Sequence, residues 1–215
     1  MSTQPGLRER KKRQTRALIT EVAQRLFSER GFDAVTVAEV ARAADVSEGT
    51  VYNYFPTKED LFYGGMEAFE AELVEAVRQR PPGEPALTAF RRFVLDGMDR
   101  LAGDQVAEVV ATAARLVGAS RTLQAREREI VAHSTDALAS LIAEDTGAPA
   151  GEIEASAVAA ALMGVQRALV AHVHTRVLAG AHGPELAAGT RAQAERAFAR
   201  LETGLRGYAP APPRP

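Results

Sequence analysis

The chain has 215 residues and no cysteine, which excludes disulfide bonds and thiolate metal sites. Its hydrophobic fraction of 46% and charged fraction of 25% are ordinary for a globular protein, and its net charge of −2 argues against general affinity for nucleic acid. No stretch of about 18 uncharged apolar residues occurs, and the chain start lacks the apolar core of a secretory signal. We therefore expect a cytoplasmic protein without a membrane span.

The first sixteen residues are strongly basic. Six Lys and Arg side chains stand there against Glu9 alone. A basic arm on a near-neutral protein is the electrostatic footprint of nucleic-acid binding at one end of the molecule. Residues 8–12 also fit a solvated terminus, and we expect residues 1–9 to form a flexible tail. Arg13 and Arg16, at the start of the first helix, are the better candidates for phosphate or minor-groove contacts.

A helix is expected from about residue 10 to residue 30. Gly31 follows it at the position where a helix commonly ends in a left-handed residue. Apolar residues recur along it at helical spacing and should form its buried face. These residues are Leu18, Ile19, Val22, Ala23, Leu26 and Phe27.

Three N-cap signals follow in close succession between residues 36 and 60. Thr36 with Glu39 has the spacing of a capping box, Ser47 is a second N-cap, and Thr57 with Asp60 is a third. Caps this close together define two short helices, joined by a tight turn, ahead of a longer helix. The pattern predicts a helix-turn-helix, which presents its second helix to the DNA major groove.

The second short helix has an outer face suited to DNA. Val51 and Phe55 lie four residues apart and are expected to point inward. Asn53 can pair with an adenine edge, the methyl group of Thr50 can touch a thymine methyl, and Gly49 lets the backbone approach the groove floor. The residues left on or near the outer surface are Glu48, Gly49, Thr50, Tyr52, Asn53 and Tyr54.

Phosphate contacts are expected beside this face. The hydroxyl groups of Tyr52 and Tyr54 can reach phosphate oxygens, which position a protein without reading sequence. Lys58 falls in the first turn of the next helix, where free backbone N–H groups also attract a phosphate.

Residues 46–62, VSEGTVYNYFPTKEDLF, preceded by RLFSERGFDAVTVAEVARAA at 25–44, resemble the DNA-binding domain of the tetracycline-repressor (TetR) family. The resemblance extends from about residue 13 to residue 62. It implies phosphate contacts from Thr36, Tyr52, Tyr54 and Lys58 and base-facing positions for Glu48, Gly49, Thr50 and Asn53. It also implies an all-helical homodimer with a C-terminal ligand-binding domain.

The next helix should begin at Thr57 and end near residue 80, before Pro81-Pro82-Gly83. Its interior contains Gly64 and Gly65, although each glycine costs a helix roughly 1 kcal/mol relative to alanine. Close packing against a neighbouring helix is the favoured explanation for such a pair, and a bend between DNA-binding and ligand-binding parts is the other.

Five further helices complete an all-α fold of about nine helices. They are expected at about 85–102, 103–118, 121–144, 152–178 and 185–204. In the second of them Val106, Val109, Val110 and Leu116 should face inward. The charged residues 125–129, and carboxylate pairs such as Glu70 with Glu72, fit a solvated surface. The predicted division is a DNA-binding domain at 10–62 and an effector-binding and dimerisation domain at 63–206, with a proline-rich tail at 207–215.

The last two helices suggest how a dimer forms. The apolar band of residues 152–178 is too wide for a helix that packs on one neighbour only. Together with residues 185–205 it can meet its symmetry mate in a four-helix interface with isologous contacts. The resemblance to the TetR family implies the same arrangement.

No catalytic or metal-binding constellation is found in the sequence. His172 and His174 are two residues apart, so a helix turns them about 200° away from each other and they cannot share a metal. Glycine-rich phosphate loops and nucleophile elbows are also missing. We expect no enzyme activity, cofactor or metal.

Ten residues are candidates for an effector site. An apolar cavity with a polar anchor suits a small apolar or amphiphilic ligand, although the same residues can simply fill the core. Arg115, Gln166 and Arg167 are the candidate anchors. The full set is Phe62, Met66, Phe69, Phe90, Phe93, Met98, Arg115, Met163, Gln166 and Arg167.

The sequence thus predicts a one-component regulator that binds a palindromic operator and is a repressor released by a small ligand. One alternative is a TetR-like DNA-binding protein without an effector, whose C-terminal part serves dimerisation or a protein partner. A second is a helical enzyme or carrier that uses the N-terminal bundle for packing only.

Overall fold

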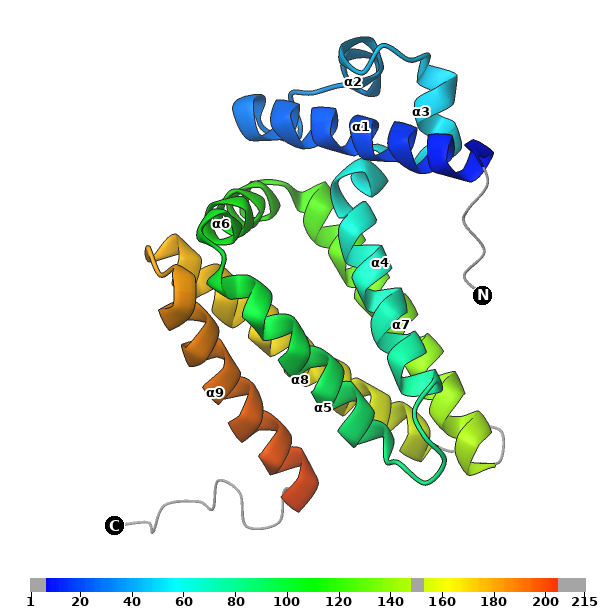
Figure 1. Ribbon diagram of the computed structural model, residues 1–215, viewed down its shortest axis with the longest axis vertical. Helices are drawn as coiled ribbons and strands as arrows, with labels where there is room; N and C mark the ends of the chain where they lie inside the picture. The colour runs from blue at the N-terminus through cyan, green and yellow to red at the C-terminus, as the bar shows by residue number, and fades with distance from the viewer. Residues whose placement is uncertain (1–6, 148–152, 205–215) are drawn as a thin grey trace. The chain divides into compact units, whose positions relative to one another are not determined.

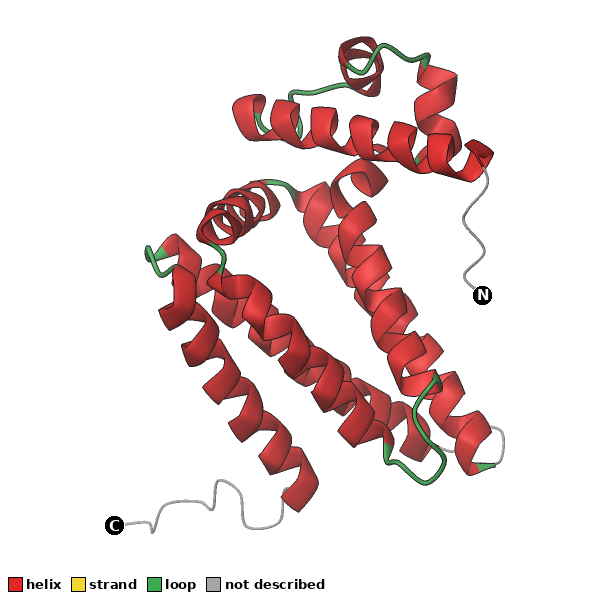
Figure 2. Ribbon diagram, viewed as in Figure 1, coloured by secondary structure: helices red, strands yellow, loops and turns green. Residues whose placement is uncertain are grey.

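A computed structural model describes residues 7–147 and 153–204, and all regular secondary structure within these ranges is helical (Figures 1 and 2). The prediction of an all-α fold with about nine helices is confirmed for these residues. The last predicted tail, 207–215, lies outside them. The helices are α1 Leu7–Arg30, α2 Val37–Ala43, α3 Glu48–Tyr54, α4 Lys58–Arg78, α5 Ala86–Gly97, the 3₁₀ helix η1 Met98–Ala102, α6 Asp104–Ala119, α7 Arg121–Thr146, α8 Ile153–Leu178 and α9 Gly183–Thr203.

The chain divides into two compact units, and the first contains the helix-turn-helix. It comprises the chain up to Glu70 together with Thr112–Ile130. Its hydrophobic core therefore includes two residues of α7 as well as residues of α1 to α4. The core members are Ile19, Val22, Ala23, Phe27, Phe32, Val35, Val37, Val40, Ala41, Ala44, Val51, Phe55, Leu61, Tyr63, Leu123 and Ile130.

Helix α1 begins at Leu7, so residues 7–9, which were expected in a flexible tail, are helical, while residues 1–6 of that predicted tail lie outside the described residues. Its buried stripe is centred on Ile19, Ala23 and Phe27, which recur every four residues and are all 0% exposed. Leu18 was expected in this stripe but is 46% exposed, because it lies one helical step outside the arc that faces the core. The expected end of the helix is confirmed: Gly31 has φ +84°, and its N–H donates to the carbonyl of Phe27 at 2.9 Å.

The cap signals are confirmed. The side chain of Ser47 accepts from the N–H of Thr50 at 3.1 Å and so caps α3. At the start of α4, the N–H of Thr57 donates to Asp60 Oδ2 at 2.9 Å, while the N–H of Asp60 donates to Thr57 Oγ1 at 3.2 Å. These bonds satisfy backbone N–H groups at the helix N-termini that have no partner within the helix. They therefore fix the first residues of α3 and α4.

The two glycines of α4 differ in their surroundings. A Cβ on Gly64 would lie 3.2 Å from Arg16 Nη2 and 3.3 Å from a ring carbon of Phe55, whereas a Cβ on Gly65 would have nothing within 4 Å. Gly64 is therefore a close packing contact within the first unit, where α4 approaches the side chains below α3.

The second unit comprises Ala71–Ala111 and the chain from Val131 onward. Helix α9 packs against α5, η1 and α8 in this unit. Phe90 of α5 and Phe198 of α9 are both fully buried, with ring centroids 6.1 Å apart in an edge-on arrangement. Arg191 of α9 donates to the carbonyl of Leu95 at 3.0 Å and to Asp99 Oδ1 at 2.7 Å. Aromatic packing and this bridging arginine together hold α9 in place.

The inward face of α6 differs from the prediction. Val109 was expected to be buried but is 64% exposed, whereas Ala107, Ala111 and Ala114 are buried. Alanines at this spacing lie on one face of the helix, and their small size lets a neighbouring helix approach closely. Val109 lies on the opposite face.

Among the described residues, α8 is the one helix that is long and apolar enough to cross a membrane by length and composition. Eight of its residues are buried inside the second unit, including Leu162, Leu169 and Val173. Packing against α5 and α9 accounts for this apolar face. Val158 and Leu178 are 39% and 52% exposed at separate places along the helix.

Two charged groups expected at the surface are engaged instead. Glu70 is only 3% exposed, so it is not part of a solvated carboxylate pair. Arg126, in the charged run 125–129, forms ion pairs with Asp60, Glu67 and Glu129. Residues 125–129 are therefore not a uniformly solvated surface, because Arg126 forms ion pairs with α4 while Arg128 and Glu129 are exposed.

Candidate nucleic-acid interface

The outer side of α3 is the most prominent candidate surface for DNA. Val51 is fully buried beneath the helix, and Phe55, at its C-cap, is 1% exposed. Because of the helical repeat, Glu48 lies next to Tyr52 and Gly49 next to Asn53 on the opposite side, and all four residues are exposed. A substituent on Gly49 would meet only Ser47 Oγ, at 3.8 Å. The helix thus presents a small, open and polar surface.

Thr50 and Tyr54 are placed differently from these four residues. Both are half-buried, and Tyr54 packs against the core of the first unit. The Thr50 hydroxyl lies 2.8 Å from Ser47 Oγ, within hydrogen-bonding distance. The structure therefore joins Thr50 to the N-cap of α3 at one edge of the exposed face.

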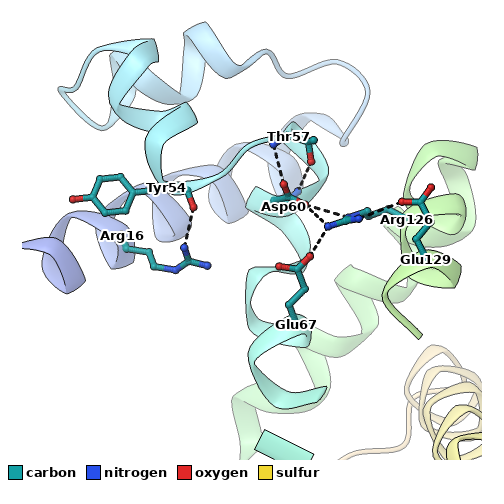
Figure 3. Close-up of polar contacts among 7 residues, drawn as sticks. All are labelled: Arg16, Tyr54, Thr57, Asp60, Glu67, Arg126 and Glu129. Atoms are coloured by element: carbon teal, nitrogen blue, oxygen red, sulfur yellow. Dashed lines mark hydrogen bonds and ion pairs between the residues drawn. The ribbon is translucent and has the colours of Figure 1, made fainter. Parts of the chain in front are cut away.

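Arg16 of α1 contacts the C-terminal end of α3. Its Nη1 donates to the carbonyl oxygen of Tyr54 at 2.9 Å (Figure 3). Its Cζ lies 4.4 Å from the centroid of the Phe55 ring. An arginine in this position satisfies a carbonyl that the end of a helix leaves unpaired. A phosphate contact from Arg16 stays a prediction, and the geometry shows that Arg16 holds the end of α3.

Lys58 is also directed at an internal partner. Its Nζ lies 4.2 Å from the centroid of the Phe32 ring, a cation–π geometry. Partial burial lowers the pKa of Lys58, while the charge of nearby Asp33 opposes that shift. A phosphate contact from Lys58 would require the ammonium group to turn away from this ring.

The remaining predicted phosphate contacts are Arg13, Tyr52 and Thr36. Arg10, Lys11, Lys12 and Arg13 are all exposed on α1, whereas the side chain of Arg8 lies outside the described residues. Tyr52 is 49% exposed. Thr36 is exposed, but its hydroxyl already donates to Glu39 Oε2 at 2.9 Å.

Glu39 is the most strongly held carboxylate near this surface. Its Oε2 accepts from the backbone N–H of Thr36 at 2.8 Å, and its Oε1 pairs with Arg30 Nη1 at 2.8 Å. The bond from the Thr36 backbone, followed by the Arg30 contact, lowers the pKa of Glu39 from 4.5 to about 2. The carboxylate form thus stabilises the start of α2.

This lowered pKa predicts an acid-dependent loss of stability. The contribution of Glu39 is complete above about pH 4.5 and falls as the pH drops toward 2, because the folded state resists protonation more than the unfolded state. We expect Glu39→Gln to lower the midpoint of urea unfolding at pH 7, with a gap to the wild type that narrows between pH 4.5 and pH 3. A gap of constant size over that range would contradict this assignment.

The candidate effector residues fall into both units. Phe62 and Met66 pack against the core of the first unit. Phe69 and Phe93 are half-buried, whereas Phe90, Met98, Met163 and Gln166 are buried. Within the part of the chain that the structure describes, Gln166 Oε1 has no hydrogen-bond partner.

Two of the three candidate anchors do not fit a pocket. Arg115 and Arg167 are exposed, and Arg115 Nη2 donates to Thr112 Oγ1 of its own helix at 3.0 Å. Neither arginine is a buried polar anchor in this chain. Both lie on the solvent side of helices whose buried sides consist mainly of small and apolar residues.

Sequence reasoning missed the ion pair between Asp60 and Arg126. Arg126 Nη2 lies 2.9 Å from Asp60 Oδ1 and 2.7 Å from Glu67 Oε1 (Figure 3). The two partners in the first pair are 66 residues apart. The capping spacing of Asp60 was visible, but no local pattern indicates that its second oxygen binds an arginine from α7.

Comparisons with known proteins agree with this geometry. Residues 19–63 match the family model described as bacterial regulatory proteins, tetR family. The regulator TcmR of Streptomyces glaucescens is 35% identical over 86 residues, which are 40% of this chain and 38% of TcmR. The chain spans less than two thirds of the length of this relative and of the next curated relative that it matches.

Solved structures share the fold over nearly the whole chain. The complex of SmeT with triclosan superposes with a TM-score of 0.56 at 16% identity, covering 94% of this chain and 99% of SmeT. The FadR repressor of Thermus thermophilus with lauroyl-CoA gives 0.50 at 22% identity, covering 93% and 100%. These structures support the fold alone. The proteins of the matched family are transcriptional regulators rather than enzymes, and residues 19–63 of this chain, which include its helix-turn-helix, are similar to them.

Proposed function

We propose that this protein is a dimeric, sequence-specific DNA-binding regulator, acting as a repressor that a small apolar or amphiphilic ligand releases from a palindromic operator. The supporting observation is the exposed face of α3, where Glu48, Gly49, Tyr52 and Asn53 lie together on a helix capped by Ser47. Residues 10–62 would bind DNA, and residues 63–206 would bind the effector and form the dimer.

The outer face of α8 supports the dimer. Ala157, Ala161, Ala168 and Ala171 are exposed and follow each other at steps of four, seven and three residues, which keeps them on one side of the helix, and the exposed Leu178 lies a further seven residues along. Small residues let two helices approach closely, and an isologous contact uses the same face on both subunits. Such a pair would carry two recognition helices roughly 34–36 Å apart, one turn of DNA, or a multiple of that distance.

The effector proposal rests on the second unit. Its buried side chains are mostly apolar, such as Phe90, Met98 and Met163, and the buried Oε1 of Gln166 has no hydrogen-bond partner among the described residues. A mainly apolar interior with an unpaired polar atom suits an amphiphilic molecule. Ligands of this chemistry, triclosan and lauroyl-CoA, occupy the solved structures with the same fold. The ligand would act by binding more tightly to a conformation with the wrong recognition-helix spacing.

Selection from a pool of random-sequence duplexes, with the full chain at low salt, tests the proposal. We expect enrichment of a two-fold symmetric site with half-sites one helical turn or a multiple apart. Failure to enrich any sequence, or enrichment of a single unsymmetrical half-site, would contradict the proposal that the protein binds specific DNA sequences as a dimer.

A second measurement distinguishes a regulator that binds an effector from one that does not. A thermal-shift screen with apolar and amphiphilic compounds should find ligands that raise the unfolding temperature, because a ligand that binds only the native state stabilises it. A chain that binds its selected DNA but is stabilised by none of them would favour a C-terminal part that serves dimerisation or a protein partner.

A further inference from the structure

Ser120 and the first two turns of α7 make polar contacts with the loop after α1 and with α4. Ser120, which precedes the helix, donates from Oγ to Asp33 Oδ1 at 3.1 Å. The carbonyl of Leu123 accepts from the buried hydroxyl of Tyr63 at 3.1 Å. Arg126 follows three residues later. This regular spacing directs one side of α7 toward the loop after α1 and toward α4.

Arg126 contributes the strongest of these contacts. Its Nε lies 3.1 Å from Asp60 Oδ1 and its Nη2 lies 2.9 Å from the same oxygen, while Nη2 also reaches Glu67 Oε1 at 2.7 Å. Nη1 pairs with Glu129 at 3.2 Å (Figure 3). The side chain of Asp60 is only 8% exposed, so its charge depends on Arg126 far more than a solvated carboxylate would.

Asp60 uses its two oxygens for different tasks. Oδ1 binds Arg126, and Oδ2 accepts from the backbone N–H of Thr57 in the cap of α4. Thr57 is separated from Tyr54, the last residue of α3, by only Phe55 and Pro56. An arginine that fixes the Asp60 carboxylate therefore fixes the start of α4 and, through a very short connection, the end of the recognition helix.

The other end of this connection is also held by an arginine. Arg16 binds the carbonyl of Tyr54 on the α3 side, and Arg126 binds Asp60 on the α4 side (Figure 3). Arg16 belongs to α1, which precedes the helix-turn-helix. Arg126 comes from α7, which continues beyond residue 130 into the second unit, as α4 does beyond residue 70.

We infer that Arg126 is a positioning residue for DNA binding: through Asp60 it sets the orientation in which α3 is offered to the groove, without touching DNA itself. This inference rests on the proposed DNA-binding function. Its physical basis is the cost of breaking the Arg126–Asp60 ion pair. Any movement of α7 relative to α4 must either keep this pair or break it, and a broken pair leaves the buried Asp60 carboxylate without its counter-charge.

The test compares Arg126→Gln with Arg128→Gln, a matched change at an exposed arginine of the same helix. Binding is measured on DNA selected by the wild-type chain, at several salt concentrations and well below the unfolding temperature. Stoichiometric titration counts the molecules able to bind, and equilibrium titration gives their Kd. We expect Arg126→Gln to raise Kd about 10-fold with an unchanged number of competent molecules, and Arg128→Gln to match the wild type.

Three further readouts separate positioning from other roles. The slope of log Kd against log salt should equal that of the wild type, because Arg126 neutralises no phosphate. Arg126→Lys should recover part of the affinity. Adding Asp60→Asn, which keeps an oxygen for the cap, to Arg126→Gln should cost less than the sum of the two single changes, because both act on one pair.

Several outcomes would overturn the inference. They are an unchanged Kd for Arg126→Gln among competent molecules, an equal loss for Arg128→Gln, a salt slope reduced by about one, and additive losses in the double variant. If the wild-type chain itself selects no DNA, the proposed function fails instead, so the two failures are distinguishable.

Discussion

Gly49→Glu is expected to weaken DNA binding by about 100-fold while leaving the fold intact. The new side chain would project from the exposed side of α3, where a Cβ meets only Ser47 Oγ at 3.8 Å. It would occupy the space that a base edge needs and bring a negative charge toward the phosphates. Helix stability should not suffer, because glycine is a poor helix former and a carboxylate is favourable in a first helical turn.

Equilibrium titration on selected DNA measures this loss, and thermal unfolding measures the stability. Gly65→Glu is the matched control, since it places the same side chain at an exposed helical glycine with nothing within 4 Å of its Cβ. We expect the control to bind as the wild type does. Equal affinity for Gly49→Glu and the wild type would mean that this side of α3 does not meet DNA.

Phe27→Ala is expected to destabilise the first unit by about 3–5 kcal/mol and to abolish DNA binding at 37 °C. Phe27 is 0% exposed, and its ring centroid lies 5.1 Å from that of Phe32 and 6.4 Å from that of Phe62. Truncation removes a large, fully buried side chain from the core of the first unit, and the surrounding backbone can close such a cavity only in part.

Amide hydrogen exchange shows where the loss occurs. Phe27→Ala should speed exchange in α1 to α3, whereas Phe198→Ala, the same change at a fully buried ring of the second unit, should speed exchange mainly in α5 and α9. Identical exchange patterns in the two variants would show that the chain opens as one unit, and the assignment of Phe27 to a separate DNA-binding core would be wrong.

Local signals made the helix-turn-helix readable from the sequence. The caps at Thr36, Ser47 and Thr57 each join residues three positions apart. Val51 and Phe55 are four residues apart, the spacing of neighbours on one face of a helix, with more polar residues between them. Propensity, cap and periodicity therefore pointed to the same short helices. The exposed face of α3 followed directly from these boundaries.

The buried face of the more apolar helices was harder to predict from the sequence. In α1 and α6, Leu18 and Val109 are large apolar residues that face solvent, while alanines such as Ala23 and Ala111 are buried. Where apolar residues occur on several sides of a helix, the sequence alone does not choose which side meets a neighbour, and tertiary packing decides.

Long-range polar contacts carried no sequence signal. Arg126 stood in a charged run typical of a solvated surface, and its partner Asp60 is 66 residues away. The role of Gly64 likewise depends on Arg16 and Phe55, which only the fold brings within 3.2–3.3 Å of an added Cβ. Both features concern how the helix-turn-helix is held, which a local pattern does not record.

The central claim is that the exposed face of α3 reads DNA bases in two symmetric half-sites. The most direct measurement is the base preference of Asn53→Ala, compared with the wild type by binding to every single-base variant of the selected site. We predict lost discrimination at one base pair in each half-site, worth about 1–3 kcal/mol, with the other positions unchanged. A preference profile identical to that of the wild type, or a loss spread evenly over all positions, would contradict the claim.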